Sequence, residues 1–128
     1  LGKVPKVKRT KQYETLFIGL TLDLSKLRER IHTRLLKRIK AGMIREISNL
    51  HKNGVSWKRL YDFGLEYRYV SLYLQKKLSK EEMLAKLEQE ICQFSKRQMQ
   101  WFKRNENIKW FAPLAYSRVE KIVKKFLK

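Results

Sequence analysis

The sequence has few of the residues on which disulfide frameworks, metal sites and nucleotide-binding loops depend. Its 128 residues contain one cysteine, Cys92, which excludes a disulfide framework and a zinc site built from cysteines. The five glycines lie too far apart to form a phosphate-binding glycine-rich loop. The two histidines, His32 and His51, have no carboxylate arranged as a metal partner, so we expect both at the surface or at helix ends and predict no metal site.

Long apolar runs and acidic residues are also scarce. No run of about 18 apolar residues is present, so we expect no membrane-spanning helix. Lysine and arginine number 31 against 12 aspartates and glutamates, which gives a formal net charge of +19. Self-repulsion of that size favours a polyanionic partner, and nucleic acid is the first to consider. An anionic membrane surface is the competing partner, because basic amphipathic helices bind there by the same attraction.

The start of the chain is basic and has no helical period. Residues 1–14 include Pro5 and five lysines or arginines in the first twelve positions, so we predict a basic lead-in. They lack the uninterrupted apolar region of a secretory signal, and we therefore expect a cytoplasmic protein. Because the first residue is Leu1 and not methionine, we expect a segment of a longer protein.

Two stretches predict strands. Residues 15–23, TLFIGLTLD, are apolar or β-branched with no charge before Asp23, which is typical of a buried strand. Residues 108–113, IKWFAP, predict a second short strand closed by the proline. A buried strand needs partners, and the rest of the chain, which is mainly helical, offers almost none. We therefore expect a mainly α fold with one or two short strands, forming the C-terminal helical part of a larger α/β enzyme.

Helical periodicity predicts the other elements. An amphipathic helix begins at Asp23 or Ser25 and stops at Gly42, and a second spans residues 43–53 and stops at Gly54. Two short elements follow, SWKRLYDF and LEYRYVSLYLQKK, on either side of Gly64. The expected inward stripe of the first helix consists of Leu24, Leu27, Ile31, Leu35 and Ile39.

The clearest helix start is SKEE, in which Ser79 and Glu82 predict a capping box for a helix that runs to about Arg104. Cys92 is expected to be a small core residue of this helix. The chain ends in a basic amphipathic helix within residues 114–128. The predicted buried stripe of the long helix consists of Leu84, Leu87, Ile91, Phe94 and Phe102.

The stretch SKRQMQWFKR, residues 95–104, combines cations and aromatic rings on one predicted helix. Lys96, Arg97, Lys103 and Arg104 can share a broad face, and Trp101 lies one turn after Arg97. Such a face offers phosphate contacts, an amide from Gln98 that can read a base edge, and a ring for stacking. The alternative places the rings in the core beneath a solvated basic face, and composition favours neither.

The stretch FGLEYRYVSLYL leaves a similar choice. Tyr69 and Tyr73 fit a helical apolar stripe, so we expect them to pack. Tyr67 and Arg68 follow closely on Gly64, at a helix start where backbone N–H groups are free to bind phosphate. We expect these two residues to contact RNA.

Four motifs, in this order, resemble the C-terminal half of the bacterial tRNA dimethylallyltransferases, also called tRNA isopentenyltransferases. They are L-x-x-R-I-x-x-R at 27–34, G-x-x-x-E-I-x-x-L at 42–50, G-L-E-Y-R at 64–68 and K-R-Q-x-x-W-F-K-R at 96–104. Each motif is weak alone, but the ordered set is specific. The resemblance covers residues 15–113, which we expect to be the tRNA-binding region.

The resemblance implies a prenyltransferase that moves a dimethylallyl group from dimethylallyl diphosphate to N6 of the adenosine 3′ of the anticodon. In the family, an upstream P-loop-like half holds the diphosphate, Mg²⁺ and the general base. We therefore expect this chain to be inactive alone, to bind no cofactor, and to bind the tRNA anticodon stem-loop as a monomer. The alternative is a free-standing basic helical module that binds RNA or DNA without catalysis.

The resemblance also implies site residues. Arg34 corresponds to an arginine near the diphosphate. Glu66 and Gln100 depart from the family pattern, which commonly has glycine before Tyr-Arg and threonine before Trp. The implied tRNA-binding residues are Phe63, Gly64, Leu65, Glu66, Tyr67, Arg68, Lys96, Arg97, Gln98, Met99, Gln100, Trp101, Phe102 and Lys103.

Overall fold

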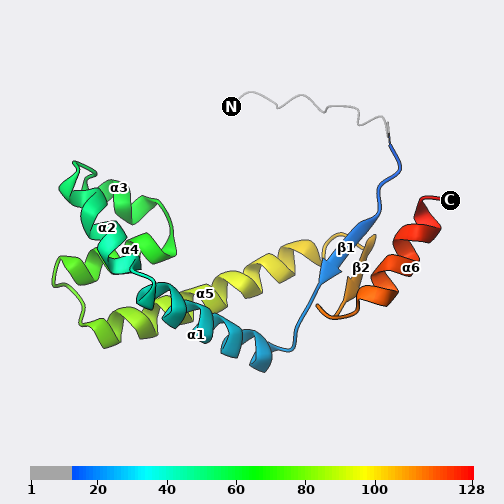
Figure 1. The fold of residues 1–128 in the computed structure, drawn as a ribbon, viewed down its shortest axis with the longest axis horizontal. Helices are drawn as coiled ribbons and strands as arrows, with labels where there is room; N and C mark the ends of the chain where they lie inside the picture. Colours follow the sequence, from blue (N-terminus) through cyan, green and yellow to red (C-terminus); the bar gives the residue numbers. More distant parts are fainter. Residues whose placement is uncertain (1–12) are drawn as a thin grey trace. The chain divides into compact units, whose positions relative to one another are not determined.

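The computed structural model describes residues 13–128, so most of the predicted basic lead-in, residues 1–12, lies outside the described residues. Helices dominate, with two short strands (Figure 1). The predicted fold class is therefore confirmed. The elements are β1 (Phe17–Leu20), α1 (Leu24–Lys40), α2 (Met43–Lys52), α3 (Trp57–Asp62), α4 (Leu65–Leu74), α5 (Lys80–Phe102), β2 (Ile108–Phe111) and α6 (Tyr116–Phe126).

The described residues divide into two units. The helical unit is Leu22–Arg104 and holds α1 to α5. The strand unit consists of residues 13–21 together with Asn105–Lys128, and it holds β1, β2 and α6.

Glycines end the first two helices of the helical unit, as their positions predict. Gly42 has a φ of 103° and separates α1 from α2, and Gly54 has a φ of 96° just after the C-cap of α2. Such positive φ angles strain any residue that carries a Cβ atom. The chain can therefore turn sharply at both points without extra loop length.

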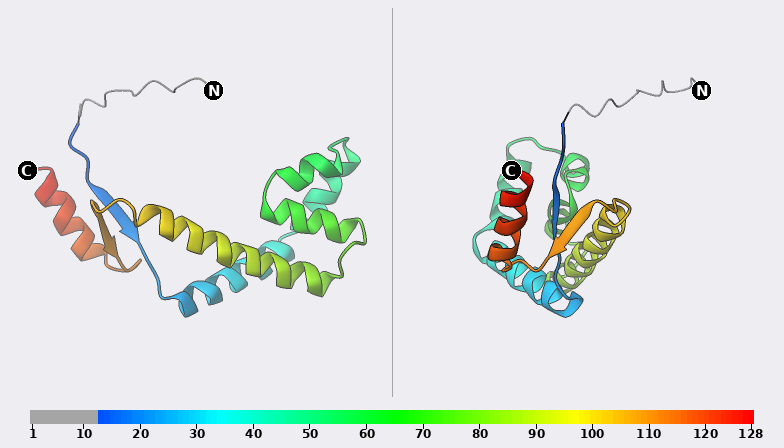
Figure 2. Two further views of the ribbon diagram at one scale, coloured as in Figure 1. Left: turned by 180° about the vertical axis from the view of Figure 1, so that it is seen from behind. Right: turned by 90° about the vertical axis from the view of Figure 1, so that its right-hand side faces the viewer.

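The capping box predicted for α5 is also confirmed. The Ser79 N–H donates to Glu82 Oε2 at 2.7 Å, and the Glu82 N–H donates to Ser79 Oγ at 3.1 Å. These bonds satisfy two backbone donors that a helix start would otherwise leave free. Figure 2 shows α5 continuing from this start as one uninterrupted helix.

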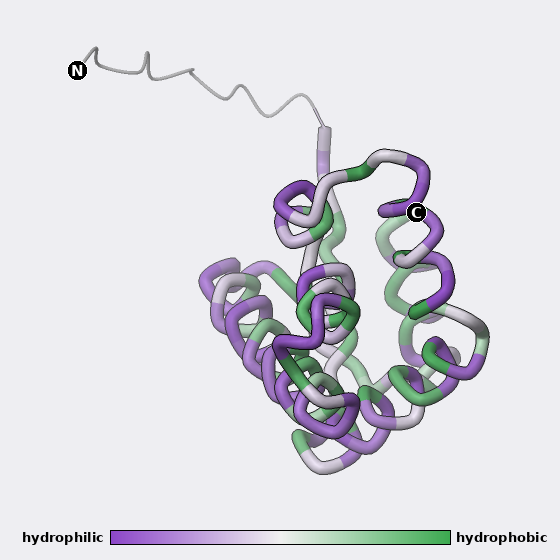
Figure 3. Tube along the Cα trace, turned by 90° about the vertical axis from the view of Figure 1, so that its left-hand side faces the viewer, coloured by the Kyte–Doolittle hydropathy of each residue, from purple (hydrophilic) through white to green (hydrophobic). Residues whose placement is uncertain are grey.

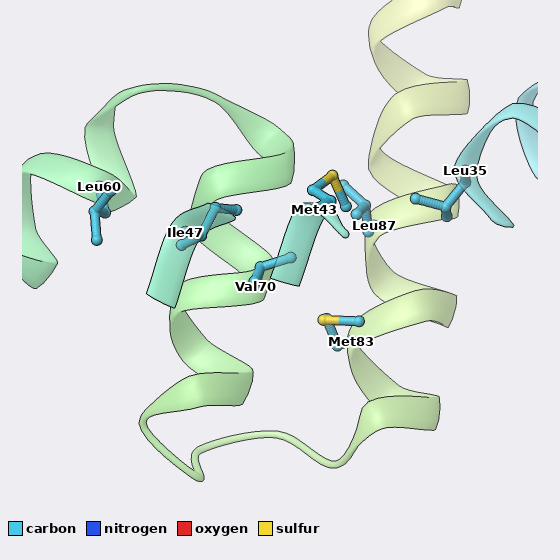
Figure 4. Close-up of a cluster of buried hydrophobic side chains, with 7 residues drawn as sticks. All are labelled: Leu35, Met43, Ile47, Leu60, Val70, Met83 and Leu87. Carbon is cyan, nitrogen blue, oxygen red and sulfur yellow. The ribbon is translucent and has the colours of Figure 1, made fainter. Parts of the chain in front are cut away.

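The core of the helical unit draws on all five helices (Figure 4). Met83, which the expected stripe omits, is fully buried on α5 beside Leu87, and Val70 of α4 packs with them. Burying one such side chain contributes about 1.5–3 kcal/mol. The seven buried hydrophobic residues are Leu35, Met43, Ile47, Leu60, Val70, Met83 and Leu87.

Part of the predicted α5 stripe is wrong. Phe94 and Phe102 are exposed, and Cys92 is half-buried on a shallow surface groove and does not lie in the core. Among the described residues, Ile91 is the last residue of α5 that packs against the core. Beyond Ile91 the aromatic side chains Phe94 and Phe102 are therefore largely open to solvent, although both are apolar.

The strand unit pairs β1 with β2 in parallel, with Phe17 opposite Ile108 and Leu20 opposite Phe111 (Figure 1). The first strand thus has a partner within the chain. A Cβ atom on Gly19 would lie 2.5 Å from the side chain of Trp110, so glycine lets that ring lie against the strand.

The prediction of a buried strand is wrong for the described residues. Phe17, Ile18 and Leu20 are exposed, because two parallel strands alone cannot cover both faces of a sheet. The terminal helix α6 is amphipathic as predicted, with hydrophobic and hydrophilic positions interleaved along it (Figure 3). None of its residues is fully buried.

Candidate nucleic-acid interface

The C-terminal end of α5 presents the first predicted segment, residues 96–103. Trp101 is 64% exposed, and Phe102 beside it is also exposed. The two rings meet edge to face, with centroids 5.1 Å apart and an interplanar angle of 82°. Lys96, Arg97, Gln98, Gln100 and Lys103 are exposed, and Met99 is half-buried. The rings are therefore not core residues, and Trp101 offers an open face to a base.

The cations on this end of α5 are weakly engaged. Arg97 Nη2 lies 4.0 Å from Glu90 Oε2, and both side chains are partly exposed. An exposed pair at that distance contributes about 0–1 kcal/mol, so a phosphate can compete for the guanidinium. Lys96 lines a shallow groove between α5 and α1, together with Arg28 and Glu88.

The second predicted segment, residues 63–68, covers the junction of α3 and α4. Gly64 is the N-cap of α4 with a φ of 143°, and no side chain caps this helix start. The first backbone N–H groups of α4 therefore have no intrahelical acceptor. Phe63 is 52% exposed just before the junction, whereas Leu65 packs against the core.

Tyr67 is anchored from within the helical unit. Its hydroxyl donates to Glu46 Oε1 at 2.7 Å, and its ring packs edge to face with Phe63 at 5.8 Å. The hydrogen bond to the Glu46 carboxylate, followed by partial burial, raises the pKa of Tyr67 above its ordinary value of 10.0. The hydroxyl is therefore already engaged, and Phe63 is the ring that faces solvent.

The prediction that Tyr69 and Tyr73 pack is confirmed, since both are half-buried against the core. Burial, as the first cause, raises the pKa of Tyr69. Both tyrosines therefore belong to the scaffold that holds α4 in place.

Arg68 is held by a residue that the sequence does not single out. Its Nε donates to the Tyr61 carbonyl oxygen at 3.3 Å, and its Cζ lies 4.4 Å from the Tyr61 ring centroid. In the same way, Arg59 Cζ lies 5.8 Å from the Phe63 ring centroid. The four-residue spacing of Arg59 and Phe63 could have revealed that pair, whereas the Arg68–Tyr61 pair depends on the turn at Gly64.

The two predicted segments belong to the same helical unit. Glu66 of α4 and Ile91 of α5 line the same cavity of about 60 Å³. Arg97 follows Ile91 by six positions, or about 9 Å along a helix axis. The second segment therefore approaches α5 less than two turns before Arg97.

Arg34 is exposed on α1 and lines the same cavity with Arg38 and Glu66. The Arg38 Nε is buried and has no hydrogen-bond partner among the described residues. Lys26, Arg30, Arg34 and Arg38 recur every fourth residue and line a shallow groove along α1. This stripe of cations suits an anionic ligand.

Metal ligands and membrane spans can be assessed for residues 13–128. Within that range, no group of three or more histidine, cysteine, aspartate or glutamate side chains could hold a metal ion. Nor does any helix there have both the length and the apolar character needed to cross a bilayer. His32 Nδ1 lies 2.8 Å from Glu88 Oε2, and His51 Nδ1 lies 2.9 Å from the Val55 carbonyl oxygen, so both rings have structural partners.

Comparison with known proteins gives a consistent match. The model of the IPP transferase family matches residues 3–105. The chain is 52% identical over 93 residues to tRNA dimethylallyltransferase 1 of Syntrophus aciditrophicus, covering 73% of this chain and 30% of that protein. It is 54% identical over 92 residues to tRNA dimethylallyltransferase 2 of Treponema denticola, covering 71% and 31%. The chain thus spans about a third of the length of these relatives.

Two solved structures share the fold at 24% identity. The full-length tRNA isopentenylpyrophosphate transferase of Bacillus halodurans matches 88% of this chain and 37% of its own, with a TM-score of 0.75. The tRNA delta(2)-isopentenylpyrophosphate transferase of Staphylococcus epidermidis matches 89% and 39%, with a TM-score of 0.77. At this identity the likeness establishes the fold alone.

Proposed function

The chain belongs to the IPP transferase family, and from this membership we propose that it is the tRNA-binding part of a tRNA dimethylallyltransferase. The complete enzyme would transfer a dimethylallyl group from dimethylallyl diphosphate to N6 of the adenosine 3′ of the anticodon. The exposed basic and aromatic end of α5, residues 96–103, is the observation that carries the proposal. This end of α5 presents exposed cationic and aromatic side chains together, which supports binding to phosphates and unpaired bases.

Each side chain of this surface has a proposed role. Lys96 and Arg97 meet the phosphates of the anticodon stem-loop, because their charges are exposed and weakly paired. Gln98 donates or accepts hydrogen bonds at the loop, and Trp101 stacks on an unpaired base. Arg68 and the free N–H groups at the start of α4 contact the loop from the second segment.

In the proposed reaction, N6 of the adenine attacks C1 of the dimethylallyl group. The C1–O bond breaks, diphosphate leaves with the electron pair, and N6 gives its proton to the general base that the resemblance implies in the upstream half. Arg34 would offset charge on the departing diphosphate from the cationic stripe of α1. Mg²⁺ would add to that effect when bound to the complete enzyme.

RNA binding can be tested by filter binding with an anticodon stem-loop that carries the target adenosine. If about six phosphates are neutralised, affinity should fall on the order of a thousandfold between 50 and 200 mM salt. A flat salt dependence would remove the electrostatic part of the proposal.

The proposal also includes a cytoplasmic location and a monomer, and sedimentation equilibrium of the chain with and without the stem-loop would detect a dimer.

We expect the chain alone to transfer no dimethylallyl group, because the diphosphate-binding half and the general base belong to parts of the family protein that it does not span. Incubation with radiolabelled dimethylallyl diphosphate and unmodified tRNA should leave the tRNA unlabelled. Label incorporated by the purified chain would contradict this assignment of roles.

The net charge of +19 favours a second candidate, a basic helical module that binds RNA or DNA without catalysis. The two candidates differ in specificity. A stem-loop with the target adenosine should compete better than random RNA of equal length if the first proposal is right. Equal competition would favour the second.

A further inference from the structure

Two cation–ring pairs lie around the α3–α4 junction: Arg59 over the ring of Phe63, and Arg68 over the ring of Tyr61. We propose that Arg59 and Tyr61, which lie outside both predicted tRNA segments, complete a site for one unpaired RNA nucleotide. The base stacks on Phe63, and Arg59 and Arg68 bind the flanking phosphates. This inference rests on the proposed function and extends its RNA interface.

The Phe63 ring is held in advance of binding. Tyr67 packs edge to face against it at 5.8 Å, and Tyr67 is itself fixed by its 2.7 Å hydrogen bond to Glu46. Because the ring is half exposed yet supported, a base can stack on it with little loss of side-chain freedom. Stacking of a base on an aromatic side chain stabilises RNA complexes irrespective of base identity.

Arg59 is placed beside that ring by the start of α3. Its backbone N–H donates to the N-cap Ser56 Oγ at 3.2 Å, which fixes the first turn of the helix. Its guanidinium then lies 5.8 Å from the Phe63 centroid. A phosphate attached to a base stacked on Phe63 would therefore lie within reach of Arg59.

Arg68 is positioned by Tyr61 through two contacts. The guanidinium carbon lies 4.4 Å from the ring centroid, and the carbonyl oxygen accepts a hydrogen bond from the Nε–H group. A guanidinium that lies on a ring keeps its outer N–H groups directed outward, in the fork that binds phosphate. Tyr61 is thus a positioning residue that acts through Arg68.

Neither arginine is neutralised by a carboxylate. The nearest acids in sequence are Asp62 and Glu66, and among the described residues neither forms an ion pair with Arg59 or Arg68. Because each guanidinium contacts an aromatic ring and not a carboxylate, its positive charge remains available to a polyanion. An exposed ring with one guanidinium over it, and a second guanidinium held at the same junction, match a single-stranded nucleotide with its phosphates better than a duplex.

The test compares the binding of an anticodon stem-loop with the binding of a blunt duplex of the same stem sequence. Arg59→Gln should weaken stem-loop binding about tenfold and lower the salt slope by about 0.7. The matched control is Arg45→Gln on α2, which removes the same charge from an exposed position of the same unit. It should change stem-loop binding less than twofold.

Tyr61 is tested by a double-mutant cycle with Arg68. Tyr61→Leu should weaken stem-loop binding about as much as Arg68→Gln, about tenfold, and the double variant should be no weaker than Arg68→Gln alone. Tyr61→Phe keeps the ring and the carbonyl group, so it should bind within twofold of wild type. A purely structural role for Tyr61 would instead give additive losses. If Tyr61→Leu does not fold, the comparison of the Arg59 and Arg45 variants decides the inference.

Two outcomes separate this inference from the function on which it rests. In the first outcome, the wild-type chain prefers the stem-loop, but Arg59→Gln and Arg45→Gln lose equal affinity for it. This result would overturn the nucleotide site and leave the proposed function standing. Wild-type chain that binds the stem-loop no better than the duplex would overturn the proposed function, and this inference with it.

Discussion

The helical unit and the strand unit differ in what they bury. All seven buried hydrophobic residues belong to the helical unit, whereas none of the described residues of the strand unit is a buried hydrophobic. Both units contain many apolar residues, so composition is not the cause. Five helices can surround a common centre, but two parallel strands leave two faces to be covered. We therefore expect the helical unit to hold its fold alone and the strand unit to need further polypeptide.

The largest test of this contrast is Leu87→Ala in the core. Leu87 is fully buried, so its truncation should lower the free energy of unfolding by about 2–5 kcal/mol. Urea denaturation followed by circular dichroism measures the change. Leu20→Ala in β1 is the matched control, because Leu20 is 59% exposed and its loss should stay within about 0.5 kcal/mol. Equal losses would show that the two units do not differ as described.

A second substitution acts on the strand unit alone. Gly19→Val would place a Cβ atom 2.5 Å from the Trp110 side chain, so the β1–β2 pair should lose about 1–3 kcal/mol. The indole N–H signal of Trp110 should shift or broaden in NMR spectra. Those of Trp57 and Trp101, in the helical unit, should stay in place, and a shift of all three would contradict the independence of the units.

A third pair of substitutions asks which unit holds RNA. Trp101→Ala should reduce stem-loop affinity by about 1–3 kcal/mol, because one stacked base loses its platform. Unfolding stability should hardly change, since Trp101 is 64% exposed. Tyr116 on α6 is 72% exposed, so Tyr116→Ala removes a comparable ring from the strand unit and should leave the affinity unchanged. A larger loss of stem-loop affinity from Tyr116→Ala than from Trp101→Ala would show that the RNA interface lies on the strand unit.

The smallest expected effect concerns Tyr67→Phe, which removes the hydrogen bond to Glu46 and should destabilise the helical unit by about 0.5–1.5 kcal/mol. Because the pKa of Tyr67 is raised in the folded chain, its contribution is fully present below pH 10. It is lost as the pH rises through the raised value. Urea melts at pH 8 and pH 11 should therefore show the two proteins converging, and a constant difference would contradict the role of the hydroxyl.

Structural features that depend on residues close together in the sequence could be predicted from it. The Ser79–Glu82 capping box and the stops at Gly42 and Gly54 depend on residues only a few positions apart. The exposure of Phe94 and Phe102 could not be predicted in this way. Helical periodicity says which face of α5 they occupy, but not how far the neighbouring helices extend along that face.

In the candidate site, too, features fixed by local sequence could be predicted, whereas contacts that depend on the fold could not. The exposed cations of residues 96–103 follow from helical spacing, and the motif order predicts that the segment binds tRNA. The contact between Arg68 and Tyr61 depends on the backbone angles of Gly64, which sequence spacing does not fix. The pairing of β1 with β2 likewise joins residues from near the two ends of the described chain.

That pairing imposes an order of events on folding. The two strands are adjacent in the sheet, yet residues 21–107 lie between them. Closing a flexible loop of that length opposes strand pairing by about 4 kcal/mol, whereas the helices form from contacts closer in sequence. The helices should therefore form first and restrict the intervening chain, and the strands should pair last. In kinetic terms, the helical unit is inserted between the two strands, and its own folding should be complete before β1 and β2 can pair.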